Sequence, residues 1–172
     1  MNSTATEPGP HSAPAASRVL VIGYGNTLRG DDAVGPLLSE RLRQTIDSNR
    51  VLVMACHQLT PELASDLAAC DRVIFIDASV DVPAGRIQCR PLAASAADAT
   101  PLVHSLGPES LLALTRLVYG RQPQAFLVSV GGLRFDFGDA RLSPPVAAAI
   151  EPALQQIREL IGIGPTTWPP AW

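Results

Sequence analysis

The sequence predicts an α/β protein: a three-layer αβα sandwich around a mainly parallel, twisted sheet of about five strands. Short apolar runs alternate along the chain with segments of helical periodicity, which is the pattern of strand–helix–strand units. Several runs are continuously apolar rather than alternating, as expected of strands covered on both faces. These runs are residues 18–23, 51–56, 72–77 and 125–130. Residues 85–92 and 132–138 have the composition of more exposed strands.

Four helices are expected between these strands. The first runs from about residue 33 to 47 and carries an apolar stripe. The second has Thr60 as N-cap and Pro61 as its first residue, and it continues to about Cys70. The third begins near Gly107 and Pro108 and ends at Gly120, and the fourth spans roughly 144–161. The expected core positions of the first, third and fourth helices are Val34, Leu37, Leu38, Leu42 and Ile46; Leu111, Leu112, Leu114 and Leu117; and Val146, Ile150, Leu154, Ile157 and Ile161.

Length and composition indicate one globular domain. The chain has 172 residues, of which 47% are hydrophobic and 17% charged, enough for a sizeable core. Residues 1–17 are predicted to be a flexible leader, 18–161 the domain, and 162–172 a flexible tail. The leader has neither the basic nor the apolar region of a secretory signal, and no apolar run approaches the length needed to span a bilayer. We therefore expect a cytoplasmic protein without a membrane partner.

The charged residues exclude several function classes. The net charge is −3, so nucleic acid is not an expected partner. All 13 basic residues are Arg; without Lys there is no Schiff-base chemistry and no P-loop lysine. The three cysteines, Cys56, Cys70 and Cys89, lack the spacing of a structural zinc site and favour reduced thiols.

The loop after the first strand poses the main question of function. It has the sequence GYGNTLRGDDAVG, and a strand, a glycine turn and a helix often form a nucleotide site. Gly23 and Gly25 match the dinucleotide pattern, but Leu28 occupies the third glycine position, and Asp31 and Asp32 would repel a pyrophosphate. The glycines, including Gly30, are interpreted as allowing tight turns or close approach.

Carboxylates at the mouth of a parallel sheet are better placed to face a cation. Asp77 ends the run 72–77, so it should emerge at the same edge of the sheet as Asp32. His104 precedes the third helix, where a loop could bring it to that edge. Two carboxylates and an imidazole suit Ni, Zn, Mn or Fe better than Ca or Mg.

Each candidate residue also has a structural explanation. Asp32 alone could be a charge favoured at a helix N-terminus, Asp77 a turn residue and His104 a loop histidine. Asp31 is predicted to cap the helix, with a role beside the metal ligands as an alternative. His57 lies at a strand end and is a weaker functional candidate.

Together the motifs resemble the [NiFe]-hydrogenase maturation endopeptidases. GYGNTLRGDDAVG, HQLTPELA, VIFIDAS, the His104 segment TPLVHSLGPES and LVSVGGLRFDFG occur in this order, and the resemblance covers about residues 18–160. It implies a phosphorylase/hydrolase-like αβα sandwich and a nickel-binding trio of Asp32, Asp77 and His104. It also implies an activity: removal of a short C-terminal extension from the hydrogenase large-subunit precursor once nickel has been inserted.

The resemblance leaves the chemistry open. The nickel would belong largely to the precursor. Either nickel polarises the scissile carbonyl or binds the attacking water, or Asp32 or Asp77 acts as the general base. A non-catalytic nickel carrier or hydrogenase assembly factor would use the same trio and is the alternative function. A covalent nucleophile is not expected, because there is no G-x-S-x-G elbow and Cys56 and His57, as strand neighbours, point to opposite faces.

Overall fold

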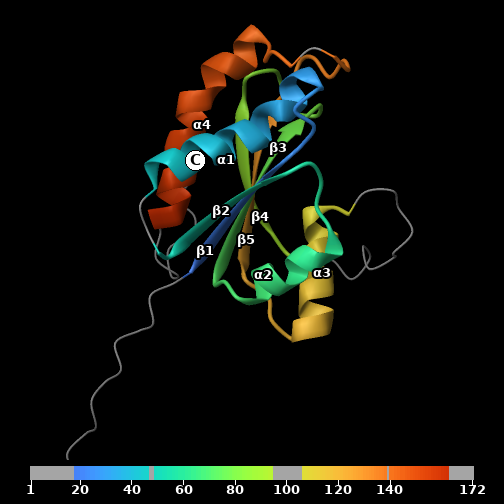
Figure 1. Ribbon diagram of the computed structural model, residues 1–172, viewed down its shortest axis with the longest axis vertical. Coiled ribbons are helices and arrows are strands. Elements are labelled where there is room, and N and C mark those ends of the chain that lie inside the picture. Colours follow the sequence, from blue (N-terminus) through green and yellow to red (C-terminus); the bar gives the residue numbers. More distant parts are fainter. Residues whose placement is uncertain (1–17, 47–48, 95–105, 139, 163–172) are drawn as a thin grey trace, which may run out of the picture.

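The computed structural model describes residues 18–46, 49–94, 106–138 and 140–162. Their centre is a five-stranded sheet of order β2-β1-β3-β5-β4 between two helical layers (Figure 1). The strands are β1 (Val19–Tyr24), β2 (Val51–Cys56), β3 (Arg72–Ser79), β4 (Ile87–Leu92) and β5 (Gln124–Gly131). β1, β2, β3 and β5 are parallel, and β4 runs antiparallel to β5 at one edge. The predicted three-layer sandwich is therefore confirmed.

Two helices cover each face of the sheet. α1 (Val34–Thr45), preceded by the 3-10 turn η1 (Gly30–Ala33), lies beside α4 (Pro144–Gly162) on one face. α2 (Ala64–Ala68), which continues the turn η2 (Pro61–Leu63), and α3 (Pro108–Tyr119) cover the other (Figure 1). All four predicted helices are present within a few residues of their expected bounds. None of the helices in the described part of the chain is long and apolar enough to cross a membrane.

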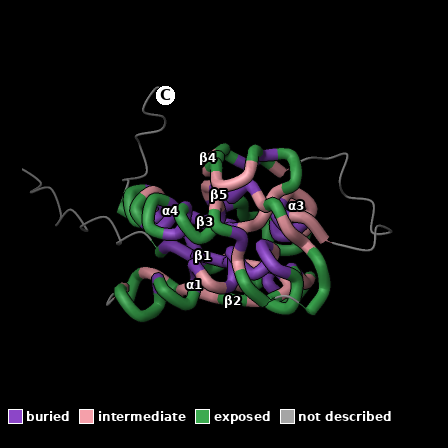
Figure 2. Tube along the Cα trace, turned by 90° about the horizontal axis from the view of Figure 1, so that it is seen from above, coloured by how far each residue is buried: buried purple, intermediate pink, exposed green. Residues whose placement is uncertain are grey.

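Alternation along the strands divides the core into two clusters. On β1, Val19 and Val21 pack against α1 and α4, whereas Leu20 and Ile22 pack against α2 and α3. The central strands are buried and the outward faces of the helices exposed, as Figure 2 shows. The same division fixes which strand-end side chains share a face of the sheet near the site.

The apolar stripes of the helices are confirmed with one exception. The predicted core residues of α1 and α4 are buried or partly buried in the cluster of their face. On α3, Leu111 and Leu112 are fully buried and Leu114 partly so, but Leu117 is 80% exposed. Leu117 lies in the last turn of α3, beyond the part of the helix that packs on the sheet.

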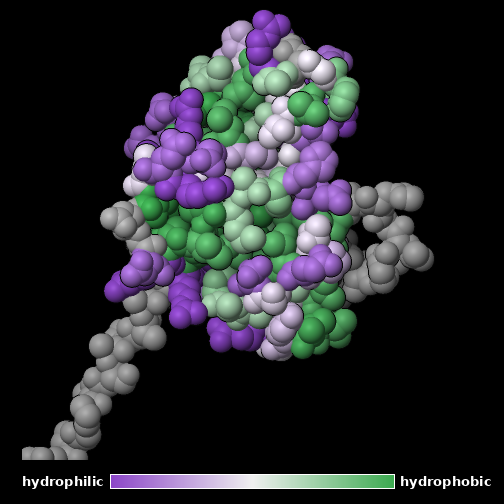
Figure 3. Space-filling view, in the orientation of Figure 1, coloured by the Kyte–Doolittle hydropathy of each residue, from purple (hydrophilic) through white to green (hydrophobic). Residues whose placement is uncertain are grey.

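The prediction that residues 51–56 are covered on both faces is wrong. These residues form β2, an edge strand that pairs only with β1 among the described strands, and Leu52 is 56% exposed. An apolar surface is visible in Figure 3 between the two helical layers, where Figure 1 places β2. The apolar run therefore identified a strand but not its place in the sheet.

The prediction of a strand at residues 132–138 is also wrong, because the segment is a loop. The backbone N–H groups of Leu133 and Arg134 donate to the Asp31 carboxylate, at 2.7 and 2.9 Å. The Arg134 carbonyl accepts from Asp31 N–H at 2.8 Å. These backbone groups are used by the η1 turn, so they are not available to a sheet.

Glycine allows α1 to lie directly on the sheet next to the site. A Cβ atom at Gly23 would come within 2.0 Å of the Gly35 carbonyl oxygen, and one at Gly35 within 2.6 Å of the Ile76 carbonyl oxygen. Both contacts are with backbone atoms, and displacing them to admit a larger residue would cost free energy. The start of α1 is thereby held against the carboxyl ends of β1 and β3.

Candidate active site

The candidate site lies at the carboxyl ends of β1 and β3, where the strand order reverses. β1 pairs with β2 on one side and with β3 on the other. The chain passes from β1 to β2 through α1 and from β2 to β3 through α2, with these helices on opposite faces of the sheet. In open α/β sheets such a switch point leaves a crevice beyond the strand ends.

Asp77 lies near the end of β3, on the face covered by α2 and α3. Val73 and Phe75 point to that face, and the two-residue period places Asp77 with them. Tyr24, the last residue of β1, packs on the same face, and its hydroxyl donates a hydrogen bond to the Asp77 carboxylate. The carboxylate is therefore held in place by the neighbouring strand.

The surroundings of Asp77 disfavour its charge. Burial raises the pKa of Asp77 to about 6, against the opposing effect of hydrogen bonds from the Tyr24 hydroxyl and the Ala78 N–H. The nearby negative charge of Asp32 acts in the same direction as burial. The pKa of Tyr24 is also raised, first by burial and then by the charge of Asp77, so its proton remains available for this bond.

Asp32 is positioned by the glycine loop. It lies in η1 and is partly buried, and its Oδ2 accepts a hydrogen bond of 2.8 Å from the Asn26 N–H. Gly25 has a φ of +143°, and a Cβ atom there would lie 2.0 Å from the Asp32 carbonyl oxygen. Gly25 is thus needed both for its backbone conformation and for the close approach of η1.

His104, the third predicted ligand, lies outside the described residues. Leu106, two residues later, packs against the apolar cluster of the α2/α3 face. Glu109, in the first turn of α3, forms an ion pair of 2.7 Å with Arg90 on β4. The charges of Glu109 and Arg90 both act on the pKa of Tyr24, so the start of α3 faces the site.

Asp32 and Asp77 lie at one edge of the sheet, and His104, the third residue of the predicted trio, lies outside the described residues. Among the residues that the structure describes, no three His, Cys, Asp or Glu side chains are grouped closely enough to hold a metal ion. The part of the expected site that the structure shows is a pair of carboxylates, one of them hydrogen-bonded to a tyrosine.

Asp31 does not cap the helix, contrary to the prediction. η1 has no side-chain cap hydrogen bond. Instead the fully buried Asp31 carboxylate accepts four hydrogen bonds from residues more than one hundred positions away: from Leu133 N–H, Arg134 N–H, Ser143 N–H at 2.6 Å and Ser143 Oγ at 2.8 Å. Burial raises its pKa, but these bonds outweigh burial and lower it overall. Asp31 is therefore a carboxylate that fixes the loops around the site.

Sequence reasoning missed Tyr24, Arg90 and Glu109. The apolar run predicts a first strand that ends at Gly23, whereas β1 includes Tyr24. The sequence does indicate which face Tyr24 occupies, because Tyr24 continues the two-residue alternation of Leu20 and Ile22. The Arg90–Glu109 pair could not be found this way, since it joins an edge strand to a helix.

The Cys56 and His57 pair shows no sign of a nucleophilic dyad. Burial raises the pKa of the Cys56 thiol, which disfavours the reactive thiolate. Cys56 packs toward the α2/α3 face, and His57 is exposed after the end of β2. Neither Cys56 nor His57 is therefore assigned a role in the site.

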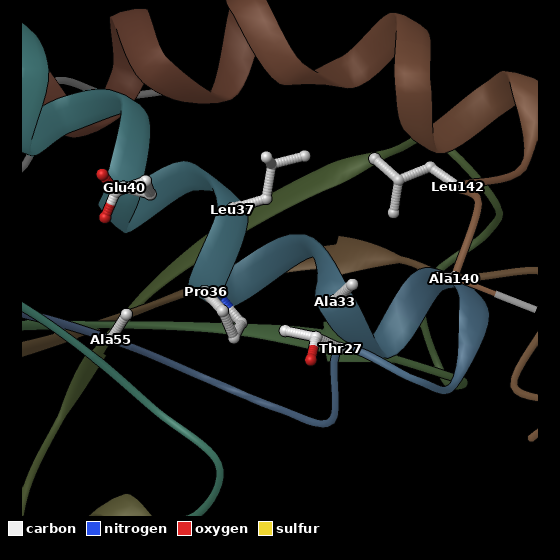
Figure 4. A pocket seen from close by; sticks show the side chains of 8 residues that line it. All are labelled: Thr27, Ala33, Pro36, Leu37, Glu40, Ala55, Ala140 and Leu142. Carbon is white, nitrogen blue, oxygen red and sulfur yellow. The ribbon is translucent and has the colours of Figure 1, made fainter. Parts of the chain in front are cut away.

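A shallow groove of about 390 Å³ borders the glycine loop on the α1 side of the sheet edge (Figure 4). Its lining is mostly apolar. The lining residues are Thr27, Ala33, Pro36, Leu37, Glu40, Ala55, Ala140 and Leu142. Neither Asp32 nor Asp77 is among the residues that line the groove.

Comparison with known proteins identifies the class. The chain is 32% identical over 147 residues to the hydrogenase 2 maturation protease of Escherichia coli, covering 81% of this chain and 88% of that protein. No protein-family model matches it. It resembles the structure of the hydrogenase maturating endopeptidase HybD from E. coli with a TM-score of 0.68 and 28% identity, over 84% of this chain and 91% of that one.

Two further structures are similar to this chain. The hydrogenase 2 maturation peptidase of Thaumarchaeota archaeon SCGC_AB-539-E09 matches with a TM-score of 0.65 and 29% identity, over 84% of this chain and 98% of that chain. The [NiFe] hydrogenase maturation protease HycI of Thermococcus kodakarensis matches with a TM-score of 0.69 and 23% identity, over 84% and 92%, and supports the fold alone. The chain is therefore a hydrolase with the αβα-sandwich fold of the maturation proteases. It belongs to the hydrogenase maturation protease family.

Proposed function

We propose that this protein is an endopeptidase that removes a short C-terminal peptide from the nickel-loaded large-subunit precursor of a [NiFe] hydrogenase. The names of its relatives support a protease that acts in hydrogenase maturation. The paired carboxylates at the switch point support a site that recognises a cation. The three free cysteines fit a reducing compartment, and we place the reaction in the cytoplasm.

The observation that carries the proposal is the position of Asp32 and Asp77. Asp32 comes from η1 and Asp77 from β3, and they lie at one edge of the sheet, where the negative charge of Asp32 adds to burial in raising the pKa of Asp77. A divalent cation between them would offset both this repulsion and the cost of burying Asp77. With His104 as a third ligand, the donors would be two carboxylates and one imidazole, which fit nickel.

This arrangement would act as a gate on the substrate. Without a cation, two close carboxylates repel each other and any acidic or thiolate group that a precursor presents. With nickel in the precursor, the same charges attract it. The enzyme would therefore process a precursor only after metal insertion.

Hydrolysis then has two routes that the variants can separate. Asp77, oriented by the Tyr24 hydroxyl, could take a proton from the attacking water, with nickel serving for recognition. Alternatively, nickel could polarise the scissile carbonyl and the carboxylates would only hold it. In the first route Asp77→Asn lowers kcat far more than it weakens binding of the loaded precursor, whereas in the second its main effect is on binding.

The test is cleavage of purified large-subunit precursor, nickel-loaded and nickel-free, followed by intact mass measurement. We expect loss of one discrete C-terminal peptide from the loaded form only. Asp32→Asn, Asp77→Asn and His104→Ala should each lower kcat/KM by about 100-fold or more. Glu159→Gln, which changes an exposed carboxylate near the end of α4, is the matched control and should cleave normally.

Two outcomes would count against the proposal. Equal cleavage of loaded and nickel-free precursor would remove the gate, and full activity of the Asp32 and Asp77 variants would remove the site. A nickel carrier, the alternative function, would bind free nickel tightly in calorimetry and release no peptide. The names of the relatives favour the protease.

A further inference from the structure

Exposed apolar side chains gather at the same edge of the sheet as the carboxylate pair. Eight large hydrophobic residues are exposed in the described part of the chain. Four of them lie on loops that follow the carboxyl ends of β1, β3 and β5. We call them the apolar rim: Leu28, Val80, Leu133 and Phe137, which are 53%, 75%, 60% and 75% exposed. Single exposed apolar residues are common, but a group on one edge of a molecule usually marks a binding surface.

The loops that carry the apolar rim are fixed to one another. Gly138 N–H donates to the Leu28 carbonyl at 2.8 Å, which joins the ends of the first and third loops. Gly132 N–H donates to the Ser79 carbonyl at 2.9 Å. Because Ser79 precedes Val80 and Gly132 precedes Leu133, this bond joins the second and third loops. The buried Asp31 carboxylate adds its bond from Leu133 N–H. A surface held in this way loses little conformational entropy when a partner binds.

The apolar rim is connected to the site by short hydrogen-bonded steps. Leu28 N–H donates to Asn26 Oδ1 at 2.9 Å, and Asn26 N–H donates to Asp32 Oδ2 at 2.8 Å. On the other side, Leu133 N–H donates to the carboxylate of Asp31, the residue that precedes Asp32. A partner on the apolar rim would therefore lie next to the carboxylate pair.

We propose that the apolar rim is the docking surface for the folded body of the hydrogenase large-subunit precursor, next to the point where its C-terminal tail enters the site. This inference rests on the proposed function. A second copy of this chain on the rim would cover the approach to Asp32 and Asp77. The occupant that fits is one whose own reacting segment must enter at this edge, and its contact region should be apolar.

A second exposed apolar group provides a matched control. Leu117, Val118 and Tyr119 lie in the last turn of α3 and are 80%, 59% and 47% exposed. The first turn of α3, with Glu109, faces the site, and the 12-residue helix carries its last turn about 15 Å away. Figure 1 shows α3 extending away from the end of the molecule where η1 and the loop after β5 lie. Substitutions there change the same kind of surface at a distance from the site.

The experiment compares Leu133→Ser/Phe137→Ser with Leu117→Ser/Val118→Ser. Both double variants replace exposed side chains, so circular dichroism and thermal unfolding should match those of the wild type. For the rim variant we expect KM and Kd for nickel-loaded precursor to rise about tenfold or more, with kcat within twofold, because only uniform binding is lost. The α3 variant should keep wild-type values.

Binding of the precursor and its cleavage are measured separately, so the two proposals can fail separately. No cleavage by the wild type, with Kd still dependent on the rim, would overturn the proposed function and leave the docking surface. Unchanged Kd and KM in the rim variant would overturn the docking surface. Sedimentation could also show a wild-type dimer that is lost in the rim variant, with Kd for precursor unchanged. That result would assign the rim to a second copy of this chain and overturn the docking surface.

Discussion

Asp31 shows how much of the site depends on one side chain that does no chemistry. It is adjacent to Asp32 in the sequence, yet its carboxylate is fully buried and satisfies four donors from the loop at 133–143. Three of these donors are backbone N–H groups, those of Leu133, Arg134 and Ser143. The two adjacent aspartates therefore have separate roles, one in fixing the loops and one at the proposed metal.

Asp31→Ala should destabilise the fold by about 3 kcal/mol, because it leaves several buried donors unsatisfied. Urea unfolding should show a lower midpoint with an unchanged slope. Cleavage of the loaded precursor should fall too, because the Asp32 loop is anchored through its neighbour.

Asp136→Ala is the control for Asp31→Ala. Asp136 is an exposed carboxylate on the same loop, so its loss should change stability by less than about 0.5 kcal/mol. Equal stability of the two variants would mean that the Asp31 hydrogen bonds do not hold the loops.

Among the elements, the position of α1 controls the position of Asp32. η1 leads directly into α1, and α1 lies so close to the strands that Gly35 has no room for a side chain. A Cβ atom there would lie 2.5 Å from the Tyr24 carbonyl oxygen and 2.6 Å from that of Ile76. Tyr24 is the site residue of β1 and Ile76 adjoins Asp77 on β3, so this contact sets the spacing across the site.

Gly35→Ala should therefore destabilise the protein by roughly 2 kcal/mol, although alanine is the better helix former by about 1 kcal/mol. The cost of overlap with backbone exceeds the gain in helix propensity. We expect kcat for precursor cleavage to fall by about tenfold or more at a temperature where the variant is folded, because Asp32 moves relative to Asp77.

Gly162→Ala is the matched comparison for Gly35→Ala. Gly162 is the last residue of α4, and a Cβ atom there would meet nothing within 4 Å. This variant should keep both stability and activity within error. A Gly35→Ala protein as stable and active as Gly162→Ala would show that the helix can shift without cost.

For the whole molecule, Arg72 stabilises the end of the sheet opposite the site. It is only 3% exposed at the start of β3. Its guanidinium donates to the Leu160 carbonyl at 2.7 Å and to Gln124 Oε1 at 2.9 and 3.0 Å, and it lies 5.9 Å from the Phe126 ring centroid. One side chain therefore joins β3, β5 and the last turns of α4.

Arg72→Met should lower stability by about 3 kcal/mol, since the charge-assisted bonds are lost and the Leu160 carbonyl stays buried. For a chain of this size the melting temperature should fall by roughly 10 °C. Arg72 lies five residues before Asp77 along β3, about 17 Å away, so kcat at low temperature should be unchanged.

Arg43→Met tests whether burial is the reason that loss of Arg72 destabilises the protein. Arg43 forms a 3.0 Å ion pair with Glu40, but both side chains are about half exposed, and such pairs contribute little. Its melting temperature should stay within about 2 °C of the wild type. A large loss of kcat in Arg72→Met would show instead that the two ends of the sheet are coupled.

Local patterns in the amino-acid sequence predict the alternation of strands and helices, the burial of β1, β3 and β5, and the placement of Asp32 and Asp77 at one edge of the sheet. These features follow from local periodicity and from the rule that parallel strands end at the same edge. The sequence could not show that residues 51–56 form an edge strand, because an apolar run looks the same at the centre and at the edge of a sheet. It also could not show that 132–138 is a loop or that Asp31 binds it. Those outcomes depend on hydrogen bonds between residues more than one hundred positions apart, which form only when the fold brings the two loops together.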